Sequence, residues 1–190
     1  MPKQKITREM VIEAAFDIAR REGMEKVIVK NIADKLGCSV QPIYSYCKNM
    51  DGLKNDVAEK ARTFILAEVG KTVDRNDLFR STGHAYIQIA KNEPHIFRMY
   101  LFQERKNVSS LDDIYCSETN PNVSKIIAEN LNISISAAKR LHLNMLIYTI
   151  GIGTIYSVTS SSISEAEIFN QQELAYEAFL KQALEDNRNE

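Results

Sequence analysis

Residues 27–53, VIVKNIADKLGCSVQPIYSYCKNMDGL, predict two short helices joined by a tight turn. Apolar side chains recur there at the spacing of one helical face, at Val29, Ile32, Ala33 and Leu36. Gly37 follows the last of them, where left-handed backbone commonly ends a helix, and Ser39 can cap the next helix. Pro42 falls in the first turn of that helix, where no intrahelical hydrogen bond is lost. Two helices joined by a tight turn containing glycine form a DNA-binding helix-turn-helix.

A wider set of residues recurs in a fixed order near the beginning of the chain: Ala14, Ala15, Gly23, Ile32, Ala33, Gly37, Ser39, Tyr44, Tyr46 and Leu53. In this order and spacing, residues 7–53 resemble the TetR/AcrR (tetracycline-repressor-like) family of bacterial transcriptional regulators. The alternative is an ordinary three-helix bundle that needs Gly and Ser only at its turns. That alternative does not explain two tyrosines beside Gln41, Ser45 and Lys48.

Three positions depart from the pattern of that family. Val27 and Ile28 stand where a Thr/Ser pair is usual before the second helix, which removes a cap and a phosphate contact. Cys47 replaces an aromatic residue, and Met50 replaces a lysine that commonly contacts phosphate. We expect these changes to preserve the fold and to weaken DNA binding.

The length and charge distribution fit a small head and a larger body. A chain of 190 residues can form one sizeable core or two smaller domains, and we expect a DNA-binding head over 1–54 and a helical body over 55–190. The net charge is −1 overall, but residues 1–55 carry +3 and the remainder carries −4. A basic head on an acidic body is expected where only the head meets phosphate.

Several classes of protein are disfavoured by what the sequence lacks. No apolar run follows the basic start, and the most apolar stretch, 143–158, is interrupted by polar residues, which favours a buried helix over a membrane span. The cysteines (Cys38, Cys47, Cys116) and histidines (His84, His95, His142) are scattered, which indicates a reducing cytoplasm and neither a metal site nor a cofactor. No catalytic Ser/His/Asp set or glycine-rich phosphate loop is evident, and Asp112-Asp113 falls in an expected polar loop, so we do not expect an enzyme.

Helical periodicity predicts an all-α fold of about nine helices. The expected helices span about 7–21, 30–36, 40–47, 49–71, 77–91, 94–104, 121–130, 134–158 and 164–185, with a loop over 105–119.

The helix over 40–47 is expected to lie in the major groove. The predicted DNA contacts are Lys30, Ser39, Val40, Gln41, Pro42, Tyr44, Ser45, Tyr46, Lys48 and Lys54. Gln41 can bond bidentately to an adenine edge, and Val40 and Pro42 can pack on a thymine methyl group. Tyr44 shares the face of Gln41; alternatively Tyr44 and Tyr46 are packing residues with only their hydroxyls exposed. Ile43 and Cys47 fall on the opposite side and are expected in the core.

The resemblance implies a homodimer that binds a palindromic operator and a small-molecule effector. The expected dimer contacts are Ile152, Ile155, Tyr156, Leu174, Ala178 and Phe179, with Lys181 at the rim. The expected pocket residues are Tyr86, Phe97, Met99, Tyr100, His142, Met145 and Tyr148. Both sets could instead belong to the core of one subunit. The favoured function is a cytoplasmic repressor relieved by its effector; the alternative is an adaptor that binds another protein through the same bundle.

Overall fold

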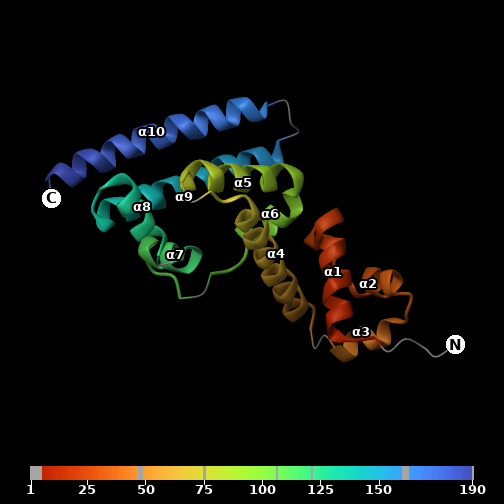
Figure 1. Cartoon of the computed structure of the whole chain (residues 1–190). Helices are drawn as coiled ribbons and strands as arrows, with labels where there is room; N and C mark the ends of the chain where they lie inside the picture. Colours follow the sequence, from red (N-terminus) through yellow and green to blue (C-terminus); the bar gives the residue numbers. More distant parts are fainter. Residues whose placement is uncertain are drawn as a thin grey trace. The chain divides into compact units, whose positions relative to one another are not determined.

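The computed structural model describes residues 6–46, 49–74, 76–105, 107–120, 122–159 and 163–189. These residues form ten α-helices and one 3-10 helix, and no strand occurs among them (Figure 1). The elements are α1 (Arg8–Glu22), η1 (Met24–Lys26), α2 (Val29–Leu36), α3 (Val40–Tyr46), α4 (Met50–Thr72), α5 (Leu78–Asn92), α6 (Pro94–Leu101), α7 (Leu111–Glu118), α8 (Val123–Leu131), α9 (Ile135–Val158) and α10 (Glu165–Asn189). The prediction of an all-α fold is confirmed.

The chain divides into two compact units. The first consists of Met1–Ala67 and Asn92–Gln103, and the second of Glu68–Lys91 and Glu104–Glu190. The first unit therefore contains the helix-turn-helix, most of α4, and α6, and it is larger than the head expected over residues 1–54.

The helix ends in the first unit follow from local side-chain and backbone chemistry. The Thr7 hydroxyl accepts a hydrogen bond from the Met10 amide at 3.2 Å, which caps α1. Gly37 ends α2 in the left-handed region, with φ of 63°. The Asn49 side chain accepts from the Gly52 amide at 2.7 Å and caps α4. Ile28 precedes α2 without any side-chain cap, which is the loss expected from the Val27-Ile28 departure.

The core of the first unit forms where α1 packs against α2, α3 and α6. Its fully buried side chains include Val11, Ala15, Val27, Ile32, Ile43, Val57, Ile96 and Phe97. Ion pairs at the surface join α1 to α4, through Arg8–Asp56 and Lys60–Glu13. Exposed pairs of this kind contribute about 0–1 kcal/mol each. Burial of apolar side chains therefore supplies most of the stability of this unit, and the ion pairs add little to it.

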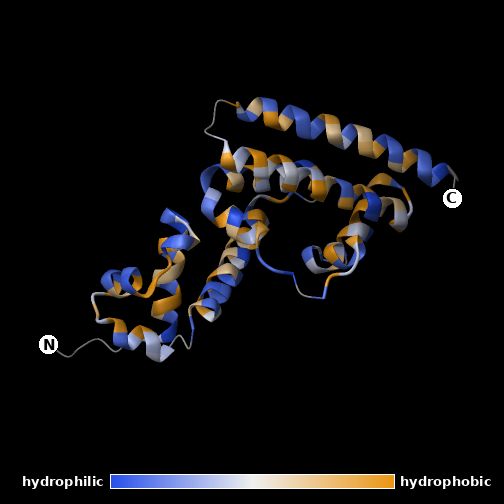
Figure 2. Ribbon diagram, turned by 180° about the vertical axis from the view of Figure 1, so that it is seen from behind, coloured by the Kyte–Doolittle hydropathy of each residue, from blue (hydrophilic) through white to orange (hydrophobic). Residues whose placement is uncertain are grey.

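In the second unit, α9 packs along α10 and against α8 (Figure 1). One apolar cluster contains Ile127 of α8, Leu141 and Met145 of α9, and Ala183 of α10. Apolar residues occur along most of α9, whereas α10 alternates between polar and apolar positions (Figure 2). The contrast indicates that α10 presents one face to α9 and another to solvent.

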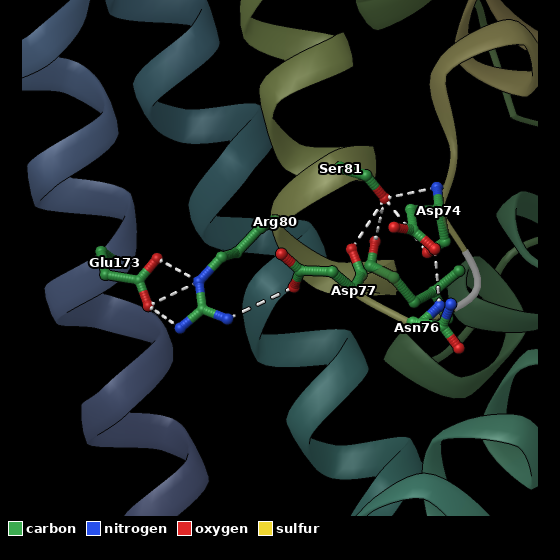
Figure 3. A network of polar contacts seen from close by, with 7 residues as sticks. Asp74, Asn76, Asp77, Arg80, Ser81 and Glu173 are labelled. Atoms are coloured by element: carbon green, nitrogen blue, oxygen red, sulfur yellow. Dashed lines mark hydrogen bonds and ion pairs between the residues drawn. The ribbon is translucent and has the colours of Figure 1, made fainter.

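An arginine on α5 connects that helix to α10 (Figure 3). The Arg80 Nε atom donates to both carboxylate oxygens of Glu173, at 2.9 and 2.7 Å, and Arg80 also lies over the Tyr176 ring. This hydrogen bonding lowers the pKa of Glu173. Beside it, the Ser81 hydroxyl donates to the Asp77 carbonyl at 2.7 Å and accepts from the Asp74 amide at 3.0 Å, which secures the start of α5.

The segment over 105–119 corrects the sequence-based prediction, because it contains the helix α7 rather than only a loop. The Ser110 hydroxyl accepts from the Asp113 amide at 3.1 Å, and Asp112 and Asp113 lie in the first turn, where acidic side chains favour a helix. Only Tyr115 of this helix is buried. With one buried residue, α7 has too little apolar periodicity to be recognised from sequence.

Among the described residues, one helix, α9, is long and apolar enough to cross a membrane, judged by length and composition alone. A core helix of a soluble bundle passes the same test. Here α9 supplies Leu141 and Met145 to a protein core, and its Thr149 hydroxyl accepts a hydrogen bond from Gln172 of α10. These contacts are those of a helix packed within a protein.

Candidate DNA-binding surface and ligand pocket

Helix α3 has one fully buried residue and exposes most of its other side chains. Ile43 has no exposed surface and fixes the helix against the core of the first unit, as predicted. On the outer side, Tyr44 is 64% exposed, and Val40, Gln41 and Ser45 are exposed as well. A helix attached by its inner face and open along its outer face has the form needed to enter a DNA groove.

The other predicted DNA contacts lie around this helix. Ser39 and Lys30 are exposed, whereas Pro42, Tyr46 and Lys54 are partly buried. The Ser45 hydroxyl donates to the backbone carbonyl of Gln41 at 3.2 Å, so this bond does not use the Gln41 side-chain amide. Lys48 and Cys47 lie outside the described residues. Tyr44 is not a packing residue in this structure, whereas Tyr46 is partly buried.

The second unit contains a cavity of about 220 Å³. It is lined by Val69, Val73, Leu78, Phe79, Thr82, Gly83, Tyr86, Glu118, Thr119, Asn120, Val123, His142, Met145, Leu146, Thr149 and Ile150. Five of these residues, from His142 to Ile150, form one stripe of α9. A mostly apolar cavity with a few polar groups is the usual form of a small-molecule site.

Three of the seven predicted pocket residues, Tyr86, His142 and Met145, line this cavity. The other four require correction. The side chains of Phe97, Met99 and Tyr100 are buried in the first unit, because α6 packs against α1 there. Tyr148 points toward α10, where its hydroxyl donates to the Gln171 carbonyl at 3.2 Å.

His142 is one of the polar groups of the cavity wall. Its Nδ1 atom lies 2.9 Å from the Tyr115 hydroxyl, and its ring meets those of Tyr115 and Phe79 edge to face. Burial lowers the pKa of His142 to about 4, so the imidazole is neutral at pH 7. When the Tyr115 hydroxyl donates to Nδ1, Nε2–H remains as a hydrogen-bond donor.

Glu118 is the carboxylate in the cavity lining. Its side chain is only 7% exposed, and one carboxylate oxygen lies 2.7 Å from Nε of Arg105. A carboxylate buried in this way needs a cationic partner, and Arg105 supplies it. The cavity wall therefore carries little uncompensated charge at this position.

A buried amide lies behind the cavity wall. Gln172 of α10 is 3% exposed, and its Nε2 atom donates to the Thr149 hydroxyl at 3.1 Å. Its Oε1 atom has no hydrogen-bond partner within the described part of the chain. A Cβ atom on Gly83 would lie 1.9 Å from Nε2, so this glycine makes room for the amide.

No family model matches the sequence. The uncharacterized HTH-type transcriptional regulator YobS of Bacillus subtilis (strain 168) is 21% identical over 194 residues, covering 99% of this chain and 98% of YobS. Among solved structures, a TetR-family transcriptional regulator from Streptomyces coelicolor aligns with a TM-score of 0.64 at 14% identity, covering 94% of this chain and 88% of that one. This chain has the TetR fold. The resemblance found in residues 7–53 is thus confirmed for the fold of the whole chain.

Two further TetR-fold structures extend the comparison. A TetR-family transcriptional regulator from Haemophilus influenzae Rd aligns with a TM-score of 0.58 at 17% identity, covering 90% of this chain and 94% of its own. A TetR variant from Acinetobacter baumannii AYE, in complex with minocycline, aligns with a TM-score of 0.60 at 12% identity, covering 96% of this chain and 99% of its own. The TetR fold therefore spans both compact units of this chain.

The predicted dimer contacts of this TetR-fold chain divide into exposed and packed residues. Ile155 is 58% exposed, and Leu174 and Ala178 are exposed too. Ile152 and Phe179 are partly buried against the core of their own subunit. Tyr156 corrects the prediction: it is buried against Ile87 and Ile168, because its side of α9 faces α5 and α10.

The sequence did not single out two further exposed apolar residues of α9. Ile147 and Val158 lie on the same side of the helix as Gly151 and Ile155, at spacings of three and four residues. Around Gly151, an added Cβ atom would meet nothing within 4 Å. The helical spacing of exposed β-branched residues was the signal that could have identified this stripe.

Proposed function

We propose that this protein is a homodimeric transcriptional regulator that binds a palindromic DNA operator through α3 and is released from it by a small molecule. The single observation that carries the proposal is the orientation of α3, in which Ile43 is buried while Gln41 and Tyr44 are exposed. The similarity to YobS along the whole chain and the TetR fold support this proposal.

The outer face of α3 has the chemistry needed to contact base edges. The Gln41 amide can donate to and accept from an adenine, and Val40 and Pro42 can contact a thymine methyl group. Tyr44 can reach a base or a phosphate, and Lys30 at the start of α2 can reach a guanine or the backbone. Both kinds of contact are needed, because phosphate contacts supply affinity and base contacts supply specificity.

Phosphate contacts would come from the end of α3 and the start of α4. We assign them to Ser45, Tyr46, Lys48 and Lys54, of which Lys48 lies outside the described residues. The α4 N-terminus, capped by Asn49, adds backbone amides.

Dimerisation would allow one protein to contact two half-sites about one helical turn apart. We propose that the partner covers an apolar stripe of α9 that is left exposed, which contains Ile147, Ile155 and Val158, together with Leu174 of α10. Gly151 within this stripe permits close approach of a neighbouring helix. The two copies would contribute equivalent helices, as expected for a two-fold interface.

Relief of DNA binding requires that the effector binds the DNA-free arrangement more tightly than the DNA-bound one. By linkage, operator DNA then weakens effector binding by the same factor. We assign the effector to the cavity of the second unit, and the protein to the cytoplasm. The adaptor alternative remains an outcome of the experiment below, because Ile28, which precedes α2, provides no side-chain cap.

Fluorescence anisotropy with labelled DNA from upstream of the gene would test the proposal. We expect specific binding whose logarithm falls linearly with the logarithm of the salt concentration. Replacement of Gln41 by Ala should lower specific affinity by about 1–3 kcal/mol, whereas binding to scrambled DNA should be nearly unchanged. The control is Gln103→Ala, the same substitution outside α3, where the amide donates to Glu59. Weak binding that is indifferent to sequence would favour the adaptor instead.

A further inference from the structure

The charges around the cavity of the second unit restrict the ligand that it can hold. Among the described residues that line it, no Lys or Arg occurs and Glu118 is the only carboxylate. Arg105 already pairs with Glu118, so this carboxylate is not a free counter-ion. An anionic ligand would meet no cation in the lining, and a cationic ligand would compete with Arg105. Burial of an unpaired charge is costly, so an uncharged ligand is favoured.

The size of the cavity sets a second restriction. Its volume of about 220 Å³ exceeds the roughly 150 Å³ of an engineered cavity that binds benzene. It is below the range of about 300–1,000 Å³ usual for drug-sized ligands. One or two fused rings therefore match the available volume.

The polar groups of the wall set a third restriction, on shape. His142 and Thr149 both line the cavity from α9. They are seven residues apart, which corresponds to about 10 Å along a helix axis. Met145 lies between them on α9, and α5 adds the aromatic side chains of Phe79 and Tyr86 to the lining. An elongated ring system with a polar group at one end could place that group beside His142 and its rings against the apolar and aromatic side chains.

The hydrogen-bonding capacity at each end is incomplete. His142 uses one ring nitrogen with the Tyr115 hydroxyl, which leaves the other nitrogen for a ligand. The Thr149 hydroxyl accepts from Gln172 and keeps its own proton to donate. The Gln172 oxygen behind it is buried and has no partner among the described residues.

We infer that the cavity binds an uncharged, elongated, mainly aromatic ligand of one or two fused rings that bears a hydroxyl or carbonyl group, with that group bonded to His142. The role of such a ligand as effector rests on the proposed function. Its binding to the cavity does not, because the cavity belongs to the second unit alone.

Four matched probes test the inference at pH 7: naphthalene, 2-naphthol, 2-naphthoate and 2-naphthylmethylammonium. They share one ring system and differ in polarity or charge. Binding can be followed by calorimetry and by naphthalene fluorescence, since the chain contains no Trp. We expect 2-naphthol to bind at least tenfold more tightly than either charged probe and severalfold more tightly than naphthalene. Equal or tighter binding of a charged probe, or no binding of 2-naphthol, would overturn the inference.

Two variants locate the ligand. Ile150→Phe narrows the cavity and should weaken 2-naphthol at least tenfold, whereas Ile135→Phe makes the same change at an exposed position of the same helix and should have no effect. His142→Leu should abolish the preference for 2-naphthol over naphthalene. This ratio is insensitive to a change in folding stability that affects both probes alike. A preference retained in His142→Leu would refute the assignment of the polar group.

Operator binding separates this inference from the proposed function. An operator titration without any probe tests the regulator assignment and does not involve the cavity. Specific 2-naphthol binding by a protein that does not bind its upstream DNA would uphold the ligand class and reject the regulator. Specific operator binding by a protein that prefers 2-naphthoate would uphold the regulator and reject the ligand class.

Discussion

His142 gives a quantitative prediction about stability and pH. Burial lowers its pKa from the ordinary value of 6.5 to about 4. Between these values the unfolded chain binds a proton that the folded chain does not. Stability therefore falls as the pH drops from 6.5 to about 4. Below pH 4 the contribution of His142 to stability no longer changes with pH. The perturbation that removes the effect is His142→Gln, which has no titrating group in this range.

The magnitude follows from the two pKa values. At about 1.4 kcal/mol per pH unit, the full difference corresponds to an order-of-magnitude loss of about 3 kcal/mol. Most of this loss, about 2 kcal/mol, should be visible between pH 7 and pH 5. The two aromatic residues in contact with the imidazole do not ionise over this range: the Tyr115 hydroxyl has a pKa raised by burial, and Phe79 carries no charge.

Urea unfolding followed by far-ultraviolet circular dichroism at several pH values would measure this effect. We expect the free energy of unfolding of the unmodified protein to fall by about 2 kcal/mol more than that of His142→Gln between pH 7 and pH 5. Glu173 and Asp113 have lowered pKa values, so their contributions are lost only at more acidic pH, and equally in both proteins. Parallel curves for the two proteins would refute the claim that His142 is buried in its neutral form.

Three further predictions concern DNA, assembly and packing. Lys30→Ala should reduce the slope of log affinity against log salt by about one in anisotropy titrations, whereas Lys125→Ala, an exposed lysine of α8, should not; equal slopes would remove Lys30 from the phosphate contacts. Ile155→Glu should convert a dimer to a folded monomer in analytical ultracentrifugation, and a dimer that tolerates this charge would place the interface elsewhere. Gly83→Ala should lower the free energy of unfolding by about 1–3 kcal/mol, because its Cβ would overlap the Gln172 amide. Gly70→Ala, a helical glycine with open space around it, should instead raise that free energy by up to about 1 kcal/mol, and equal effects would contradict the packing argument.

The helix-turn-helix could be predicted because its signals are local. Gly37 ends a helix and Asn49 starts one through backbone geometry and hydrogen bonds that span three or four residues. The outward face of α3 followed from helical periodicity, since burial of Ile43 determines which neighbours are exposed. Such features depend little on contacts with distant parts of the chain.

The cavity could be predicted only in part, because aromatic residues line cavities and fill cores with the same periodicity. Phe97 and Tyr86 looked alike in sequence, yet the former is buried in the first unit and the latter lines the cavity. The division into two units, which depends on contacts between distant segments, decides between these positions. Tyr156 was misassigned for a similar reason, since α5 and α10 cover it.

The attachment of α3 through a single buried side chain has a consequence for how such a protein can diverge. Ile43 anchors the helix, and Val40, Gln41, Tyr44 and Ser45 remain outside the packed interior. Exchanges at these four outer positions should alter folding energetics by no more than about 0.5 kcal/mol each, the usual range for surface sites. If α3 binds DNA as proposed, duplicated copies of the gene could therefore acquire new target sequences by point mutation while each intermediate still folds.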